Sequence, residues 1–214
     1  MKQGIFITIE GPEGAGKSTI LPALKDQLEA AGYPQVVLTR EPGGSRIAEQ
    51  VRQVLLDVDN IDMDFRTEAL LFAAARRQHL VDIVLPALAA GKIVICDRFV
   101  DSSLAYQGIA RGIDPTDIWS INQFAIQGYM PSLTLLVDVP ASLGLERVYK
   151  ARHQSDIDRL DRESLAFHES VRQAFLDLAK QEPRIQLVDG SQPIVTVIDA
   201  AYQLIVQHLD QTER

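Results

Sequence analysis

A glycine-rich stretch near the start of the chain constrains the fold more than any other feature of the sequence. It runs from Gly11 to Ser18 and reads GPEGAGKS. An apolar, β-branched run of strand length (4–9) precedes it, and apolar residues at helical spacing follow it (20–31). A strand, a glycine loop and a helix in this order hold an anion with backbone N–H groups at the helix N-terminus. The sequence therefore predicts a nucleotide-binding protein.

Two side chains of this loop indicate a nucleoside triphosphate with its magnesium ion. Lys17 would bring a positive charge to the β- and γ-phosphates, and the Ser18 hydroxyl would be a ligand of Mg²⁺. A glycine-rich turn before an ordinary helix would leave Lys-Ser at the helix start unexplained. The predicted ATP-binding set is the whole loop with the residue that follows it: Gly11, Pro12, Glu13, Gly14, Ala15, Gly16, Lys17, Ser18 and Thr19.

The composition argues against several other classes of protein. Lys and Arg number 21 against 29 Asp and Glu, a formal net charge of −8, which argues against a nucleic-acid-binding face. No apolar run reaches membrane-spanning length, and the chain begins a strand without a signal-peptide pattern, so we expect a cytoplasmic protein with no membrane partner. The single cysteine, Cys96, lies in an apolar run and is interpreted as a small buried side chain.

Four further strand-like runs alternate with helical patterns along the chain. They lie at 35–39, 92–96, 133–137 and 185–188. This alternation predicts an α/β fold with a five-stranded parallel sheet flanked by helices, formed by residues 1–214 as one domain. In such sheets ligands bind at the carboxyl ends of the strands, and polar residues begin where each apolar run ends.

Two of these runs end in an aspartate that could hold Mg²⁺. Asp97 is followed by Arg98, a cation suited to a phosphate, whereas Asp138 could cap the helix that begins at Pro140. Because Asp138 has an adequate structural role, we assign the metal site to Ser18 and Asp97. Neither aspartate begins a D-x-x-G motif and no N-K-x-D motif occurs, which disfavours a GTPase switch.

Two other segments have two interpretations each. Glu68, Phe72 and Arg76 share one face of a predicted helix over 67–88, which Pro86 should kink or end. Phe72 could be a core residue and Arg76 a surface one, or Phe72 could stack on a ligand ring whose polar edge Arg76 reaches. The charged segment 147–162 could be a solvated face, or a mobile lid that carries arginines onto a phosphoryl group.

Together these motifs resemble the thymidylate kinase family over nearly the whole chain. The resemblance is carried by 10–19, 39–44 (TREPGG), 71–76 (LFAAAR), 97–108 (DRF through SS to AYQG), 158–161 (DRLD) and 189–191 (DGS). It implies a P-loop nucleoside monophosphate kinase fold with a short mobile lid at about 150–162. It also implies phosphorylation of dTMP to dTDP with ATP and Mg²⁺, a homodimer, and a loop at 189–192 that cradles adenine.

The resemblance also implies the acceptor site. Phe72 would stack on thymine, Arg76 and Ser103 would read its polar edge, and Arg98 would clamp the phosphate. The complete dTMP-binding set would be Glu13, Glu41, Pro42, Arg52, Phe72, Arg76, Arg98, Ser103, Tyr106 and Gln107.

The same resemblance places catalysis on Lys17, Arg98 and the lid. One branch of the family has a basic residue where this loop has Gly14, so here the lid would supply the catalytic arginine. The candidates are Arg152 and Arg159, and the segment 150–157 looks longer than the usual lid, which leaves both open.

Two alternative functions remain open at this point. The chain could phosphorylate another nucleoside monophosphate or a deoxynucleoside, or it could be a P-loop ATPase switch. A switch needs no second nucleotide pocket, so the acceptor-site motifs argue against it.

Overall fold

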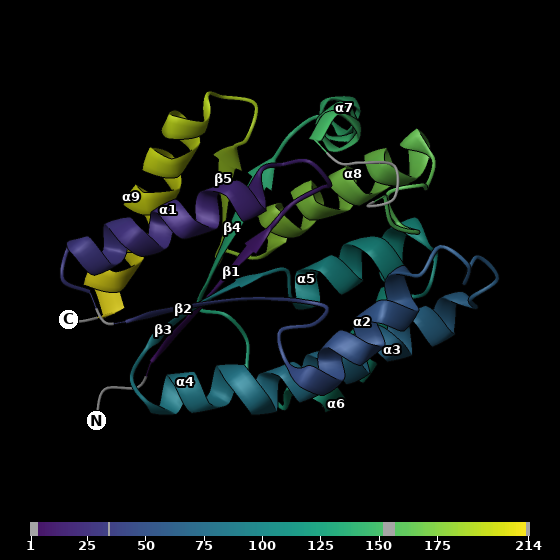
Figure 1. Cartoon of the computed structure of the whole chain (residues 1–214), viewed down its shortest axis with the longest axis horizontal. Coiled ribbons are helices and arrows are strands. Elements are labelled where there is room, and N and C mark those ends of the chain that lie inside the picture. The colour runs from purple at the N-terminus through teal and green to yellow at the C-terminus, as the bar shows by residue number, and fades with distance from the viewer. Residues whose placement is uncertain (1–3, 34, 152–156, 213–214) are drawn as a thin grey trace.

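The chain forms a five-stranded, entirely parallel sheet in a computed structural model that describes residues 4–33, 35–151 and 157–212 (Figure 1). The strand order is β2-β3-β1-β4-β5. Each strand begins and ends within one residue of its predicted run, which confirms the α/β fold: β1 (Ile5–Glu10), β2 (Val36–Arg40), β3 (Ile93–Asp97), β4 (Leu133–Asp138) and β5 (Ile185–Asp189).

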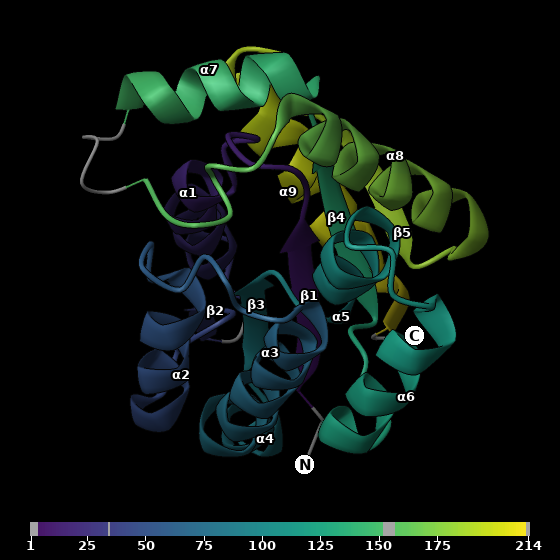
Figure 2. The ribbon, with the colours of Figure 1, turned by 90° about the vertical axis from the view of Figure 1, so that its right-hand side faces the viewer.

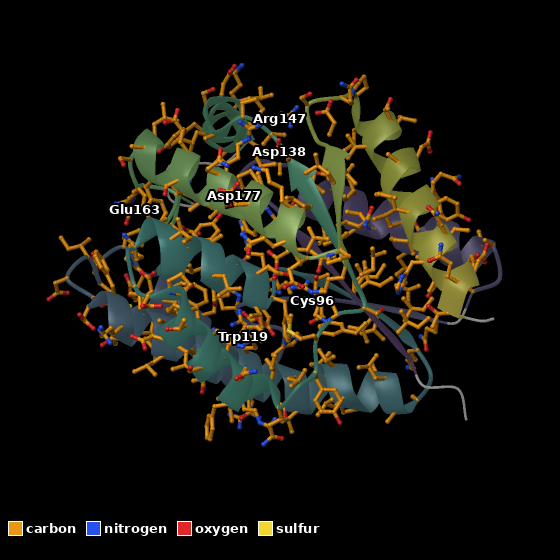
Figure 3. All side chains as sticks on the ribbon, turned by 180° about the vertical axis from the view of Figure 1, so that it is seen from behind. Cys96, Trp119, Asp138, Arg147, Glu163 and Asp177 are labelled. Atoms are coloured by element: carbon orange, nitrogen blue, oxygen red, sulfur yellow. The ribbon has the colours of Figure 1, made fainter. Side chains whose placement is uncertain are left out.

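Both faces of the sheet are covered because the strands are apolar on both sides. Ile7 and Ile9 of β1 pack toward α1 (Lys17–Ala30) and α9 (Ile194–Thr212). Phe6 faces the other way and joins the core beneath α4 (Leu85–Ala89) and α5 (Val100–Ser103). On that side α8 (Leu165–Gln181) covers β4 and β5. Cys96 is fully buried in the interior, as expected, and burial raises the pKa of its thiol (Figure 3).

The predicted helix 67–88 is longer than expected and is not ended by its proline. It consists of α3 (Phe65–His79), a π-helical turn η1 (Leu80–Val84) and α4, and it ends at Ala89. Proline has no N–H to donate, and the wider π turn just before Pro86 carries the chain past it. A second π-helical segment, η2 (Leu104–Ala110), continues α5 and precedes α6 (Pro115–Ile126).

Two helices stand beside the carboxyl edge of the sheet. α7 (Ala141–Ala151) crosses the end toward which the strands point, and α2 (Arg46–Leu56) packs against α3 (Figure 2). The predicted lid begins with the end of α7 and includes a turn at 159–162, while 152–156 lie outside the described residues. Within the described ranges, no helix is long and apolar enough to cross a membrane.

Candidate active site

The glycine loop between β1 and α1 adopts a backbone that its glycines make possible. Gly11, Gly14 and Gly16 have φ angles of 141°, 68° and 93°. A Cβ atom on Gly14 would also overlap the backbone of Gly144 in α7. The loop is therefore packed directly under α7, and no side chain at position 14 could contribute charge to the site.

Lys17 folds back over this loop. Its Nζ donates hydrogen bonds of 2.9 Å to the carbonyl oxygens of Gly11 and Pro12. Burial, together with the positive charge of Arg98, lowers the pKa of Lys17 to about 8, although Asp97 and other carboxylates oppose this shift. The ammonium group is thus positioned and partly desolvated before any phosphate binds.

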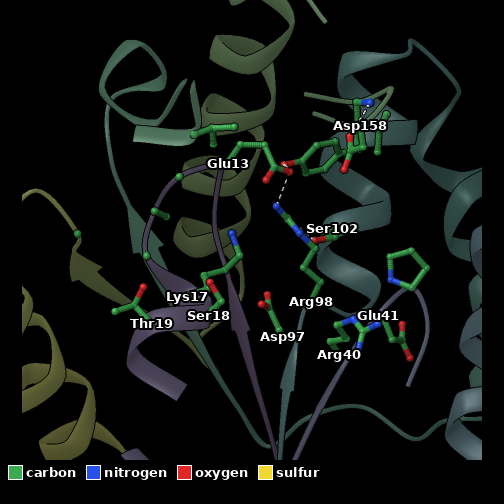
Figure 4. A pocket seen from close by; sticks show the side chains of 18 of the residues that line it. Glu13, Lys17, Ser18, Thr19, Arg40, Glu41, Asp97, Arg98, Ser102 and Asp158 are labelled. Carbon is green, nitrogen blue, oxygen red and sulfur yellow. Dashed lines mark hydrogen bonds and ion pairs between the residues drawn. The ribbon is translucent and has the colours of Figure 1, made fainter. Parts of the chain in front are cut away.

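The two candidate metal-binding aspartates differ in their partners. The Oδ1 atom of Asp97 is buried without a hydrogen-bond partner in the described part of the chain. The carboxylate of Asp138 is engaged by Arg172, whose Nε and Nη2 lie 2.8 and 2.7 Å from its two oxygens. Asp97 and Ser18 line the same cavity near Lys17 (Figure 4). A free carboxylate oxygen beside a hydroxyl is a donor set that suits Mg²⁺.

Arg98 follows β3 directly and has the left-handed φ of 69°, which is uncommon for a residue other than glycine. Its Nη1 donates to Gly11 O and Ser102 Oγ at 3.1 Å, and its Nη2 pairs with Glu13 Oε1 at 2.6 Å. The hydroxyl of Tyr106 also donates to Glu13 Oε1, at 3.0 Å. A strained backbone held by several side-chain contacts indicates a positioned functional group.

The sequence alone assigned no role to the residue that supports this cluster, although it lies at the carboxyl end of a predicted strand. The carboxylate of Glu10 accepts hydrogen bonds from Ser102 Oγ (2.6 Å) and from the Phe99 N–H (2.7 Å). Burial and the neighbouring Asp101 raise the pKa of Glu10 to about 7. A charged residue at the end of an otherwise apolar strand was the available signal.

Arg76 is a buried residue, so its interpretation as a surface residue is wrong. Its Nε pairs with Glu41 Oε2 at 2.8 Å, and its Nη1 donates to Ser103 Oγ at 3.0 Å and to Asn122. Glu41 in turn contacts His79 Nδ1 at 2.8 Å. Asn122 and His79 were not anticipated; a polar side chain at an apolar position of a helix is the signal that could have found Asn122.

One cavity of about 610 Å³ joins the glycine loop to Arg76. Its walls include most of the predicted site residues. These are Glu13, Gly14, Ala15, Gly16, Lys17, Ser18, Thr19, Glu41, Pro42, Arg52, Phe72, Arg76, Asp97, Arg98, Ser103, Tyr106 and Gln107. Gly11 and Pro12 do not line it, but their carbonyl groups bind Lys17. Phe72 is 9% exposed and lies on the cavity wall, so it is both a buried residue and a candidate stacking surface.

One of the two candidate lid arginines lies away from this cavity. Arg159 does not line this cavity: its Nη2 pairs with the buried Glu68 at 2.6 Å, because that carboxylate requires a cation. In this arrangement Arg159 is bound away from the cavity, and Arg152 lies outside the described residues. Arg147 of α7 does line the cavity and donates to Gly190 O at 2.9 Å, in the loop after β5 (Figure 3).

Comparison with known proteins assigns the chain to a family. A family model described as thymidylate kinase matches residues 9–201. Thymidylate kinases of Limosilactobacillus reuteri (strain DSM 20016) and Latilactobacillus sakei subsp. sakei (strain 23K) are each 54% identical, covering 92% and 95% of both chains respectively. The crystal structure of thymidylate kinase from Ehrlichia chaffeensis aligns with a TM-score of 0.74 at 35% identity, over 95% of this chain and 98% of that one. The chain therefore belongs to the thymidylate kinase family, which phosphorylates dTMP to dTDP.

Proposed function

We propose that this chain performs the reaction of its family by binding ATP at the glycine loop and dTMP at the Phe72 end of the same cavity. The observation that carries the proposal is the continuity of that cavity, whose walls hold both a phosphate-binding loop and a separate aromatic and arginine-lined end. A cavity of about 610 Å³ is in the size range of small-molecule sites. An ATPase switch would have no use for the second end.

The chemistry requires two phosphate groups in line and compensation of their charge. An oxygen of the dTMP phosphate attacks the γ-phosphorus of ATP, the bond from that phosphorus to the β,γ-bridging oxygen breaks, and ADP leaves. We assign Lys17 to the ATP phosphates and Arg98 to the dTMP phosphate. Bound Mg²⁺, held through Ser18 and Asp97, would neutralise further phosphate charge. Arg152 remains the candidate for a lid cation, and Arg147 faces the ATP end.

At the acceptor end, the base would be recognised by a prearranged surface. We assign Phe72 to stacking on thymine, and Arg76 with Ser103 to its polar edge. Arg76 has little rotational freedom because Glu41 and Phe99 O bind its guanidinium group at 2.8 and 2.9 Å. The remaining proposed contacts come from Glu13, Pro42, Arg52, Tyr106 and Gln107, which line the same cavity.

The substrate order tests this assignment. We expect kcat/KM to fall from dTMP to dUMP to dCMP, because a lost methyl group costs about 1–3 kcal/mol and mismatched buried donors and acceptors cost more. A coupled assay with dTMP, dUMP, dCMP and dGMP measures this order, and excess EDTA in a parallel arm should abolish turnover. Equal values for dTMP and dCMP would remove the assignment of Arg76. A purine preference would favour another monophosphate kinase, and ATP hydrolysis indifferent to every monophosphate would favour a switch.

We also propose a homodimer formed through α3 and α6. Leu70 and Val81 are exposed on α3 and η1, and Phe124 on the neighbouring α6 is 87% exposed. Large exposed apolar side chains on neighbouring helices are typical of protein interfaces. Phe124→Asp is therefore expected to convert a dimer into a monomer in light scattering coupled to gel filtration. Val195→Asp, the same change at an exposed position of α9, is the control. A monomeric wild type would contradict the proposal.

A cytoplasmic location without nucleic-acid partners completes the proposal. The net charge of −8 disfavours nucleic-acid binding. Recovery of the dTMP kinase activity in the soluble fraction of the source cells would check the location.

A further inference from the structure

Glu68 has a buried carboxylate that connects three distant parts of the chain. It lies in the first turn of α3 and has no solvent exposure. Its Oε2 accepts from Arg159 Nη2 at 2.6 Å and from Arg111 Nη2 at 3.2 Å, and its Oε1 accepts from Gln107 Nε2 at 2.9 Å. Burial acts to raise the pKa of Glu68, but these partners outweigh it and keep the pKa below its usual value. Glu68 is therefore an anion at neutral pH.

Arg159 is bound to α2 as well as to Glu68. Its Nε donates to Leu55 O at 3.1 Å, and its backbone N–H donates to Leu56 O at 3.3 Å. Its side chain is only 7% exposed. The lid turn is thus attached at this residue to the end of α2 and to the start of α3.

The residues on either side of Arg159 belong to the wall of the nucleotide cavity. Asp158 and Leu160 both line it, and Leu160 packs with Phe72 and Leu55 in one apolar cluster. The turn is also held internally, because Asp158 Oδ1 accepts the backbone N–H groups of Leu160 and Asp161 at 2.9 Å. Fixing Arg159 therefore fixes the wall beside the residue assigned to thymine stacking.

We propose that Glu68 and Arg159 form a buried latch that holds the lid turn 158–161 as a wall of the acceptor site, with Arg159 acting as a positioning residue and not as a cation on the transferring phosphoryl group. Glu68 supports the wall of the cavity through a second contact, because it also accepts a hydrogen bond from Gln107, which lines the same cavity. This inference rests on the proposed function, because it assumes that dTMP occupies the Phe72 end.

The surrounding charges oppose release of Arg159 toward the phosphates. Arg111 is the other cation on Glu68, but its Nη1 already pairs with Glu163 Oε1 at 2.7 Å. Its guanidinium group is also held against the rings of Phe65 and Phe167, at 4.6 and 4.7 Å from their centroids. Without Arg159, the buried Glu68 carboxylate would share one arginine with Glu163, an arrangement that burial disfavours.

The test separates KM from kcat. Glu68→Gln keeps the shape of the side chain but removes the charge, and Arg159→Ala removes the other partner. Each variant is expected to raise the KM and the calorimetric Kd for dTMP about tenfold, the effect of losing roughly one charge-assisted hydrogen bond, while kcat and the KM for ATP stay within about threefold. Glu68→Gln should cost less dTMP affinity in the Arg159→Ala background than in the wild type, because the two residues share one ion pair; equal costs in both backgrounds would contradict the latch. Arg159→Lys should recover part of the dTMP affinity.

Arg162→Ala, an exposed arginine three residues further on, is the matched control and should behave as the wild type. A fall in kcat for Arg159→Ala with unchanged dTMP affinity would place Arg159 on the phosphoryl group and overturn the latch. Unchanged parameters, or equal increases in both KM values, would overturn it as well. If Glu68→Gln does not fold, Arg159→Ala and Arg159→Lys decide the outcome. Absence of dTMP turnover by the wild type would contradict the proposed function instead. Failure of the latch and failure of the proposed function are therefore distinguishable.

Discussion

Lys17→Ala is expected to lower kcat by about 10³-fold or more, the effect of removing a cation from a transferring phosphoryl group. The Lys17 ammonium group is held 2.9 Å from two carbonyl oxygens of the glycine loop, and no other lysine lines the cavity in the described ranges. The fold should not depend on it. Burial lowers its pKa from 10.5 to about 8, so the charged form opposes folding at neutral pH and its removal relieves that opposition.

The measurement is kcat in the coupled assay together with the melting temperature and the far-UV circular dichroism. We expect a melting temperature that is unchanged or slightly raised. Lys25→Ala on the same helix is the control, since Lys25 is partly exposed and pairs only weakly with Glu29 at 4.0 Å. In the wild type, ATP affinity should weaken as the pH rises through about 8, because Lys17 of the ligand-free enzyme loses its proton in that range. The Lys17→Ala variant should lack this pH dependence. Native spectra with near-wild-type turnover would show that the loop is not the catalytic centre.

Arg98→Ala is expected to lower kcat/KM for dTMP by about 10²–10³-fold, the range measured when a preorganised donor to a reacting group is removed. Its guanidinium group is oriented by Gly11 O and Ser102 Oγ and lies 5.1 Å from the centroid of the Tyr106 ring. Arg98→Lys should recover only part of the loss, because an ammonium group cannot bind two phosphate oxygens as a planar fork does.

The control for Arg98 is Arg66→Ala, because the Arg66 side chain is 73% exposed and forms only a long surface pair with Asp117. The KM for ATP should stay close to the wild-type value in both Arg98 variants. Loss of kcat/KM for dTMP with a preserved melting temperature supports the phosphate-clamp assignment. An unchanged kcat/KM for dTMP would contradict it, and would leave the ion pair with Glu13 as the role of Arg98.

Where the sequence offered two similar residues for one role, contacts between distant parts of the chain distinguish them. Asp97 and Asp138 both end apolar strands and look alike in the sequence. Their carboxylates differ because Arg172 on α8 binds Asp138, while Asp97 Oδ1 has no partner among the described residues. Arg159 was one of two lid arginines that the resemblance offered for the phosphates, and in the structure the carboxylate of Glu68, 91 residues earlier, binds it. Which buried carboxylate binds which arginine depends on residues far apart in the chain, and no local sequence pattern predicts it.

The sequence by itself determined the five strands, the glycine loop and the family, because these depend on the period of apolar side chains and on glycines at positions of positive φ. It also predicted the Phe72–Arg76 helix face, since residues four apart lie on one side of a helix. Only the tertiary structure decided that Arg76 is buried between Glu41, Ser103 and Asn122, and that the lid turn is attached to α2 and α3. Those features depend on which charged groups packing removes from water together, and that is a property of the folded chain.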